Sequence, residues 1–578
     1  MKHIRNILAL VCLSLISFWP CFKADFVHWD DDLHLFQNPT VTTHSLHNSG
    51  TIFTSVVNKT YIALTILTFN IEHYFFGLNP FVYHVDNFIL HSLICFVIYA
   101  LLIRMGLNCS TAFLSTLIFA IHPMHVESVA WVTQRKDVLY SFFYILSIFY
   151  YWKYLTQHQR SSYVISLVLG SLSILAKPMA LSLPFTLLIF DWYYQGRINK
   201  QSIMNKLPFV LVIVPMAWVT YALNSRAIAI NIPESFLIWS WSATFYIKKF
   251  FTPFVLLPLY QLPQPVSIFN PSYASSVLLL IAMPLAVFYY RKDRLLIFAS
   301  LFYILSTFFL WRYDNTVDVT IVGDRFMYLP SLGLCVWLGS CLSEQISGHK
   351  SKWLLASCVL FLILSILTYR QCLVWKNDIS LWQHELRYEQ KSALAYNSYG
   401  VALSARQNTD AALENLGKAI AINPKYTLAY YNRGHILAKL NKTDQALNDF
   451  TTSLSLNPKH FNSYLERGTI YSRQNKYAEA LDNFNNAQKL EPQNAGVYNN
   501  RGIVYKKLGE FKNALEDYNQ ALRLNPMLAS AWVNRAKVWE ELKDFSKALE
   551  DLRQAQKLGI SVDSTYLNKL ELLAGTKN

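Results

Sequence analysis

The chain has 578 residues, of which 53% are hydrophobic and only 15% are charged. Soluble domains carry about 25% charged residues, so this composition excludes an ordinary soluble protein and indicates a membrane protein. The formal net charge is +15, and in a membrane protein such an excess of Lys and Arg first indicates loops retained in the cytoplasm. Because no basic run is interleaved with aromatic residues, we expect no nucleic-acid partner.

Apolar stretches close to membrane-spanning length recur through the first part of the chain. A spanning helix needs about 20 apolar residues, with a lower limit of about 17. The stretches are 7–22, 81–103, 111–130, 138–155, 162–176, 178–194, 207–224, 274–290, 295–311, 327–343 and 353–369. We therefore predict an all-α fold that begins with a polytopic helical membrane bundle of about 11 spans, over residues 1–372. The first stretch is expected to remain as a membrane anchor.

Short basic loops set the expected orientation. The loops 195–206, 291–294 and 348–352 are basic and predict the cytoplasmic side, which leaves the first loop and the C-terminus outside. The segment 236–251 is also apolar, but a crossing there would place 291–294 outside. We therefore expect 236–251 to lie in the membrane interface.

The rest of the chain repeats. Four prolines are spaced 34 residues apart: Pro424, Pro458, Pro492 and Pro526. A period of 34 is that of the tetratricopeptide repeat, which predicts an α-solenoid. We divide this part into a linker at 373–392, five repeats at 393–562 and a tail at 563–578. The groove of such an array indicates a protein or peptide partner, and a scaffold for dimerisation is the alternative.

Three consecutive acids stand in the first outside loop, "FVHWDDDLHLFQNP" at 26–39. Taken alone, Asp30, Asp31 and Asp32 indicate only a solvated turn with a helix cap. The predicted topology, however, places other ionisable residues at the same outer face, where such groups are costly and indicate a functional site. These residues are His122, His125, Glu127, Arg135, Lys136, Lys177, Asp324 and Arg325.

Each of these residues also has a structural explanation. Lys177 and Arg135 could extend to lipid headgroups, and Asp324 could pair with Arg325. His122, His125 and Glu127 have a spacing that allows a metal ion, but Pro123 breaks the helix and no further His is suitably placed. We therefore expect neither a metal site nor a divalent cofactor. The recurrence of acids and cations at one face favours a site over the separate explanations.

That mixture suits transfer of a sugar from a lipid-linked phosphate. Cations hold the charge of a phosphate leaving group. A carboxylate accepts the proton of a weak hydroxyl nucleophile, and a nearby carboxylate also stabilises an oxocarbenium-like sugar carbon. Inverting transfer from a polyprenyl-phosphate donor would need both kinds of group together.

Five stretches carry a resemblance to a known family. They are "FVHWDDDLHLFQNP", "FFGLNPFVYHVDNFILHSL", "IFAIHPMHVESVAWVTQRKDVLYSFFYILSIFYYWKYL", "ILAKPMALSLPFTLLIFDW" and "GDRFMYLPSLG". With the C-terminal repeats, they resemble the transmembrane and tetratricopeptide repeat-containing O-mannosyltransferases and their bacterial relatives. The resemblance implies a C-type glycosyltransferase fold with an exoplasmic active site. It also implies a polyprenyl-phosphate sugar as donor substrate, rather than a tightly bound cofactor.

The resemblance also implies roles for particular residues. Asp30 and Asp31 match the family's acidic pair, with Asp30 the first choice for the catalytic base and Asp32 a supporting acid. Glu127 matches the second acidic position. The cations expected to face the donor phosphate are Arg135, Lys136, Lys177 and Arg325. From their place at the same predicted face, we also expect His122, His125 and Asp324 to support the site. One departure is that "YIALT" has Ile62 and Ala63 where the family usually has a cation and a proline.

The leading interpretation is therefore a membrane glycosyltransferase that moves a mannose-like sugar to a hydroxyl of a protein or glycan. The repeats would position that acceptor or another partner. The alternative is a non-catalytic membrane scaffold that assembles an envelope complex through its repeats. A transporter would instead place its polar residues near the bilayer midplane. We expect the bacterial inner membrane with periplasmic repeats, or the endoplasmic reticulum membrane if the chain is eukaryotic.

Overall fold

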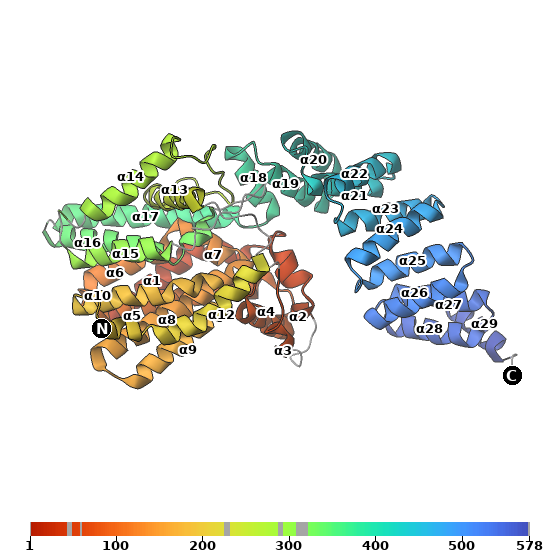
Figure 1. Ribbon diagram of the computed structural model, residues 1–578, viewed down its shortest axis with the longest axis horizontal. Helices are drawn as coiled ribbons and strands as arrows, with labels where there is room; N and C mark the ends of the chain where they lie inside the picture. Colours follow the sequence, from red (N-terminus) through yellow and green to blue (C-terminus); the bar gives the residue numbers. More distant parts are fainter. Residues whose placement is uncertain are drawn as a thin grey trace. The chain divides into compact units, whose positions relative to one another are not determined.

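The computed structural model describes residues 2–42, 49–57, 60–224, 232–286, 289, 293–307, 322–348 and 350–575. Throughout these ranges the regular elements are helices, accompanied by two isolated β-bridges. The chain divides into two units, Met1–Tyr388 and Glu389–Asn578 (Figure 1). The all-α prediction is therefore confirmed, and the boundary falls inside the predicted linker.

Several helices of the first unit are long and apolar enough to cross a membrane. Within the described ranges they are Lys2–Lys23, Pro80–Arg104, Lys200–Val219 and Ser351–Val374. A fifth span is counted if Cys109–Ile121 and Pro123–Ala130, which are bent by 52° against each other, form one broken span. Three further apolar helices are shorter: Arg160–Ala176, Pro271–Met283 and Arg294–Ser306.

In the described residues this number is lower than the 11 spans predicted, and parts of the predicted spans 274–290 and 295–311 lie outside those residues. Prolines give another part of the reason. The helix before Pro123 ends at Ile121, and a 3₁₀ turn, η4 (Pro123–His125), follows. Likewise, α9 (Arg160–Ala176) ends before Pro178, which begins the 3₁₀ turn η6 (Pro178–Ser182). Proline lacks the N–H that a continuing helix needs and disfavours helical backbone in the residue before it. Apolar sequence therefore continues through positions where the helix stops.

The remaining elements of the first unit have the following bounds. Up to residue 134 they are α1 (Lys2–Phe18), η1 (Trp19–Lys23), η2 (Asp32–Phe36), α2 (Pro39–Thr42), α3 (Ser49–Ile52), α4 (Ala63–Phe76), α5 (Pro80–Arg104), α6 (Cys109–Ile121), α7 (Val126–Ala130) and η5 (Val132–Gln134). From residue 135 they are α8 (Arg135–Gln157), α10 (Leu183–Gln195), α11 (Lys200–Met204), α12 (Leu207–Asn224), α13 (Ile232–Phe251), α14 (Pro271–Ala286), α15 (Arg294–Ser306), η9 (Asp324–Met327), α16 (Ser331–Gly348), α17 (Lys350–Val374) and α18 (Asp378–Tyr388).

Small residues let these helices approach closely. A Cβ added at Gly339 of α16 would lie 2.6 Å from the backbone nitrogen of Ser115 on α6. A Cβ at Gly333 would lie 2.5 Å from the carbonyl oxygen of Ala299 on α15. Helix pairs in membranes gain stability from such close contact, because lipid offers them little hydrophobic driving force.

The segment predicted to lie in the interface is α13, and it packs into the unit along one side. The hydroxyl of Tyr246 donates to the carbonyl of Gly323 at 2.8 Å, and the ring of Phe250 stacks on His122 with centroids 4.5 Å apart. These contacts place α13 beside the segment that holds Arg325. Its position relative to a membrane stays a prediction.

Most of the predicted linker belongs to the first unit. Trp382 of α18 packs on Trp29 with ring centroids 5.1 Å apart, and His384 donates to the carbonyl of Leu256 at 3.0 Å. The backbone N–H of His28 also donates to Asp378 at 2.8 Å. The helix that precedes the second unit is therefore docked on the loop that carries the three acids.

The second unit is a row of helix pairs. The pairs are α19 (Ala393–Ala405) with α20 (Thr409–Ile422), α21 (Thr427–Lys439) with α22 (Thr443–Leu456), α23 (Phe461–Arg473) with α24 (Tyr477–Leu490), α25 (Ala495–Lys507) with α26 (Phe511–Leu524) and α27 (Ala529–Glu541) with α28 (Phe545–Lys557). The tail contains a further helix, α29 (Ser564–Gly575), which packs on α28. Leu570 of α29 is buried, so part of the predicted tail closes the end of the array.

Candidate functional site

The three acids of the first loop face three different environments. Asp31 is fully buried and accepts hydrogen bonds from the backbone N–H groups of Val27 (2.9 Å) and Thr133 (3.2 Å). Asp32 pairs with His28 at 2.7 Å on the surface. Asp30 is intermediate in exposure and forms an ion pair with Lys136 at 3.3 Å. The single run of carboxylates therefore includes a loop anchor, a surface ion pair and a candidate reactive group.

Their protonation differs accordingly. Burial raises the pKa of Asp31 to about 7, although its two backbone hydrogen bonds oppose that rise. Burial also tends to raise the pKa of Asp30, but the charges of Lys136 and Arg325 outweigh it and hold the pKa below the ordinary value. The Asp30 side chain is 26% exposed. Of these two carboxyls, Asp30 is thus the one that stays ionised at neutral pH while keeping access to its surroundings.

Glu127 and Arg325 form a second ion pair. The backbone N–H of Arg325 donates to Oε2 of Glu127 at 2.9 Å, and its guanidinium Nη1 donates to Oε1. Glu127 is 2% exposed and Arg325 14% exposed. The guanidinium also lies over the rings of Trp131 (5.6 Å) and Phe326 (4.7 Å). Gly323 makes this fit possible, because a Cβ there would lie 2.7 Å from Nη1 of Arg325.

Lys177 forms the third pair, with a residue that sequence reasoning did not select. Its ammonium donates to Oδ1 of Asp137, which is fully buried in the first turn of α8. The Lys177 nitrogen lies 5.6 Å from the ring centroid of Phe326, the neighbour of Arg325. An acid in the first turn of a helix ordinarily indicates only pairing with the helix dipole, so its sequence position did not mark Asp137 as a site residue.

The three pairs share one electrostatic neighbourhood. Burial lowers the pKa of Arg325, but Glu127, Asp30 and Asp137 together raise it above its ordinary value. These residues come from the loop before η2, from α7, from α8 and from η9, with Lys177 following α9. The structure therefore brings together Asp30, Glu127, Lys136, Lys177 and Arg325. We call these residues with Asp137 the charged cluster.

Arg135 does not join the charged cluster. Its Nη1 pairs with Glu72, while Nε donates to Oδ1 of Asn87 and Nη2 to the carbonyl of Tyr83, both at 2.8 Å. The side chain is only 1% exposed. Arg135 and Lys136 are consecutive at the start of α8, and consecutive residues of an α-helix point about 100° apart. This rotation sends Lys136 to Asp30 and Arg135 into the interior.

The remaining predicted residues lie beside the cluster and are held by packing. Nε2 of His122 donates to the carbonyl of Phe250 at 3.0 Å, and His125 bonds the carbonyl of Phe119 (2.6 Å) and the hydroxyl of Ser331 (2.7 Å). Asp324 accepts from the hydroxyl of Tyr260 at 3.0 Å. In the described ranges, no three His, Cys, Asp or Glu side chains are grouped as a metal ion would require.

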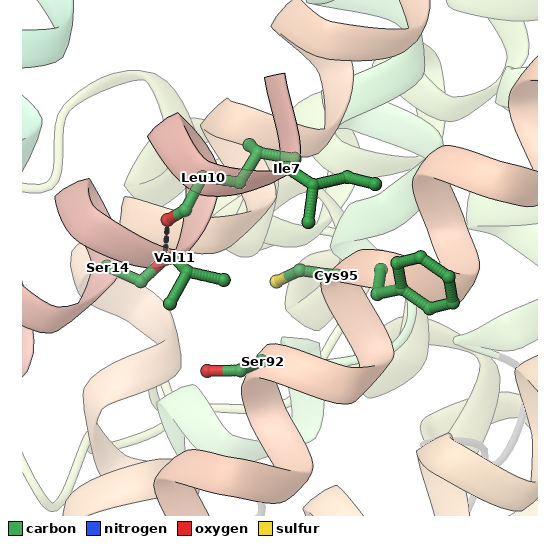
Figure 2. A pocket seen from close by; sticks show the side chains of 7 residues that line it. Ile7, Leu10, Val11, Ser14, Ser92 and Cys95 are labelled. Atoms are coloured by element: carbon green, nitrogen blue, oxygen red, sulfur yellow. Dashed lines mark hydrogen bonds between the residues drawn. The ribbon is translucent and has the colours of Figure 1, made fainter. Parts of the chain in front are cut away.

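A separate pocket lies between α1 and α5 (Figure 2). It is lined mainly by apolar side chains, together with Ser14, Ser92 and Cys95. The hydroxyl of Ser14 donates to the carbonyl of Leu10 at 2.8 Å, so this donor is already used within α1. The pocket holds neither acids nor cations among its lining residues, and the charged cluster is thus the candidate site.

Comparisons with known proteins support both the tetratricopeptide repeats of the second unit and the predicted family. A family model described as "Tetratricopeptide repeat" matches residues 427–460 and 495–528, and another of that description matches 450–482. A "TPR repeat" model matches 400–441 and 468–509. The chain is also 26% identical over 459 residues to Protein O-mannosyl-transferase F38B6.6 of Caenorhabditis elegans, covering 74% of this chain and 64% of that one.

Two further relatives belong to the same group. Protein O-mannosyl-transferase TMTC1 of Homo sapiens is 23% identical, with 72% of this chain and 54% of the relative covered. Protein O-mannosyl-transferase TMTC3 of Mus musculus is 23% identical, with 73% and 51% covered. The resemblance to this family is confirmed, at modest identity. The match spans about half to two thirds of these curated relatives' length.

Among solved structures, "YrrB: a TPR protein with an unusual peptide-binding site" is 19% identical and covers 33% of this chain and 97% of its own, with a TM-score of 0.29.

Proposed function

We propose that the protein is a membrane glycosyltransferase that moves a mannose-like sugar from a polyprenyl-phosphate donor to a hydroxyl of a protein or glycan. The observation that carries this proposal is the charged cluster, in which three acids and three cations meet from five segments of the chain. The mannosyltransferase names of the relatives support the sugar and the reaction class. The exoplasmic face, and a bacterial inner membrane with periplasmic repeats, belong to the same proposal.

The cations would receive the donor phosphate. Lys136, Lys177 and Arg325 are 12%, 9% and 14% exposed, so each is largely removed from water and interacts strongly with an anion. As the sugar's anomeric carbon separates from the phosphate oxygen, the bonding electrons pass to the phosphate. The three cations stabilise that charge as it develops.

Asp30 would act as the base. The acceptor hydroxyl oxygen bonds to the anomeric carbon, and Asp30 takes the hydroxyl proton. Attack from the face opposite the phosphate inverts the sugar carbon. Glu127 holds Arg325 through both its backbone and its guanidinium, so its role is positioning. Asp137 holds Lys177 in the same way.

Donor binding would also change the base. At 3.3 Å, the Lys136–Asp30 contact is a long hydrogen bond. A donor phosphate would compete with Asp30 for Lys136, and loss of that partner would raise the pKa of Asp30. A carboxylate with a higher pKa is a stronger base, so the base would strengthen when the donor is in place.

The scaffold remains the second candidate, and one observation favours it. Ile62 and Ala63 stand where the family usually has a cation and a proline, and both lie in a buried apolar cluster with Phe26, Leu35 and Phe69. That position thus contributes no charge to a site.

The test is a donor panel with purified full-length protein in lipid nanodiscs. Labelled polyprenyl-phosphate mannose, other polyprenyl-phosphate sugars and GDP-mannose would be offered with envelope proteins as acceptors. We expect transfer from a polyprenyl-phosphate sugar, with Arg325→Gln lowering kcat/KM by about 100-fold. Transfer only from GDP-mannose would contradict the donor class, and consumption of none of the donors would favour the scaffold.

A further inference from the structure

The first helices of the repeats form one continuous face of the second unit. Successive first helices contact each other along the row, and they approach more closely than the second helices do. Asn432 donates to Asn397 at 2.9 Å and Asn534 to Asn499 at 3.0 Å, both between first helices. His435 lies 3.2 Å from Glu466 in the same way. In a curved row the layer with the closer helices is the inner one, so these residues mark the inner face.

Charge is distributed unevenly between the two layers. The three central first helices α21, α23 and α25 contain seven Lys or Arg residues and one acid, Glu466. The second helices that pair with them, α22, α24 and α26, contain six acids and three Lys or Arg residues. The excess of cations therefore belongs to the inner layer of the array.

Some of the inner cations are already neutralised. Arg433, Arg501 and Arg535 each form a bidentate pair with an Asp sixteen residues later, in the second helix of the same repeat. In the third repeat the position of that acid is taken by Asn483, which accepts from Arg467 at 2.8 Å. These arginines link the first helices to the second helices. Their ion pairs neutralise only part of the excess positive charge of the first helices.

Another set of cations lies one or two turns further along the same helices. Lys439, Arg473 and Lys506 each follow an inner-face residue (Asn432, Glu466 and Asn499) by seven positions, which is close to two helical turns. They therefore share the inner face. Lys439 and Arg473 are exposed, as are the neighbouring Lys507 and Lys537. We call these five residues the basic strip.

The cations of the strip crowd one another. Burial lowers the pKa of Lys506 first, and the charges of Lys537 and Lys507 lower it further, although Glu541 and Glu540 of α27 oppose them. Lys537 belongs to the next first helix, α27, so the strip continues from one repeat to the next. Cations in a last helical turn can pair with the helix dipole, and the second helices α24 and α26 also end in one, Lys489 and Arg523. The basic strip is therefore distinguished by its place on the inner face, and not by its place at helix ends.

We propose that the basic strip binds an acidic stretch of an extended polypeptide. This inference rests on the proposed function, in which the repeats position an acceptor or partner, and it adds the charge of that partner. A polypeptide fits better than a lipid surface, because the half-buried side-chain amides of Asn432 and Asn534 lie along the same face and can hydrogen-bond a peptide main chain. The curved inner face also suits a narrow chain more than a flat bilayer.

The experiment measures peptide binding by the full-length protein in nanodiscs of neutral lipid. The probe is a fluorescent peptide of about 12 residues rich in Asp and Glu, beside a neutral peptide of the same length. We expect the triple variant Lys439→Glu, Arg473→Glu, Lys506→Glu to raise the Kd of the acidic peptide at least about tenfold. Binding by the unchanged protein should weaken as salt rises.

A matched variant separates this effect from net charge. Lys418→Glu, Lys489→Glu and Arg523→Glu make the same charge change on exposed positions of second helices, and we expect Kd to stay within about twofold. Equal loss in both variants would overturn the proposal, as would equal binding of the neutral peptide or displacement of the acidic peptide by anionic vesicles. Donor hydrolysis measured on the same preparations reports the first unit separately, so failure of the proposed enzyme would be recognised independently.

Discussion

Asp30 differs from its neighbours in its partner, a lysine that holds it ionised while part of its surface stays exposed. Asp31 gives both carboxylate oxygens to backbone N–H groups, and its pKa rises to about 7 because it is buried. Asp32 is occupied by His28, whose pKa rises to about 9 through that hydrogen bond. One run of identical side chains thus holds a loop, pairs at the surface and supplies the candidate base.

Lys136→Gln should move the acid limb of the pH–rate profile. Lys136 lowers the pKa of Asp30, so its removal raises that pKa, and a higher pH is then needed to ionise the base. We expect the acid limb of kcat/KM to shift toward higher pH, together with a larger KM for the donor because a phosphate contact is lost. Lys153→Gln, which removes a cation from a distant turn of α8, is the control. An unchanged acid limb in Lys136→Gln would exclude Asp30 as the group that sets it.

The charged residues at the outer ends of the predicted spans could be found from sequence, but their grouping could not. Lys136, Lys177 and Arg325 meet acids that are 106, 40 and 198 positions away in the chain. A sequence shows that such residues recur at one face, whereas the direction of each side chain depends on helix rotation and on the loop. Arg135 illustrates this limit, because it is adjacent to Lys136 and yet joins Glu72. Asp137 was missed because an acid in the first turn of a helix ordinarily indicates only pairing with the helix dipole.

At the scale of elements, the repeat period predicts where helices lie, whereas a long apolar stretch does not predict where a helix ends. The period of 34 located the helix pairs of the second unit, because each repeat places the same residues at the same contacts. Spans were harder to count, since 3₁₀ turns at Pro123 and Pro178 interrupt apolar sequence. Composition also did not reveal that α18 packs on the loop of the three acids. Trp382 of α18 contacts Trp29, and most of the first unit's sequence separates the two residues.

Two glycines of the repeats should respond oppositely to alanine. A Cβ at Gly468 would lie 2.9 Å from Cε1 of Phe484, whereas a Cβ at Gly417 of α20 meets nothing within 4 Å. Gly468→Ala should therefore destabilise the second unit by about 1–3 kcal/mol through overpacking. Gly417→Ala should stabilise it by up to about 1 kcal/mol, because alanine favours a helix over glycine. Urea unfolding followed by circular dichroism measures both, and destabilisation by both variants alike would contradict the packing described for α23 and α24.

At the scale of the whole molecule, the two proposed functions belong to different units. The charged cluster lies wholly within the first unit, and the basic strip wholly within the second. Tethering two functions in one chain raises the local concentration of a bound partner to roughly millimolar values. Relatives named as O-mannosyl-transferases align with about three quarters of the chain.

Removal of residues 389–578 should separate the two functions. The truncated chain retains α18 and every residue of the charged cluster, so donor binding and slow hydrolysis of the donor by water should persist. Transfer to the native acceptor should fall by about 100-fold or more, because the tethered acceptor is lost. Gel filtration and circular dichroism must show that the truncated chain is folded. Full transfer by a folded truncation would show that the repeats do not position the acceptor.

The most direct measurement is the rate of sugar transfer from polyprenyl-phosphate mannose by Asp30→Asn, Asp31→Asn and Asp32→Asn, each made in the full-length protein. Asn keeps the shape of Asp but cannot accept a proton at neutral pH, and general base catalysis contributes about 100- to 10,000-fold. We predict a loss of that size for Asp30→Asn with donor affinity retained, little change for Asp32→Asn, and a loss for Asp31→Asn that follows its effect on folding. A folded Asp30→Asn protein that transfers mannose at the full rate would contradict the central claim.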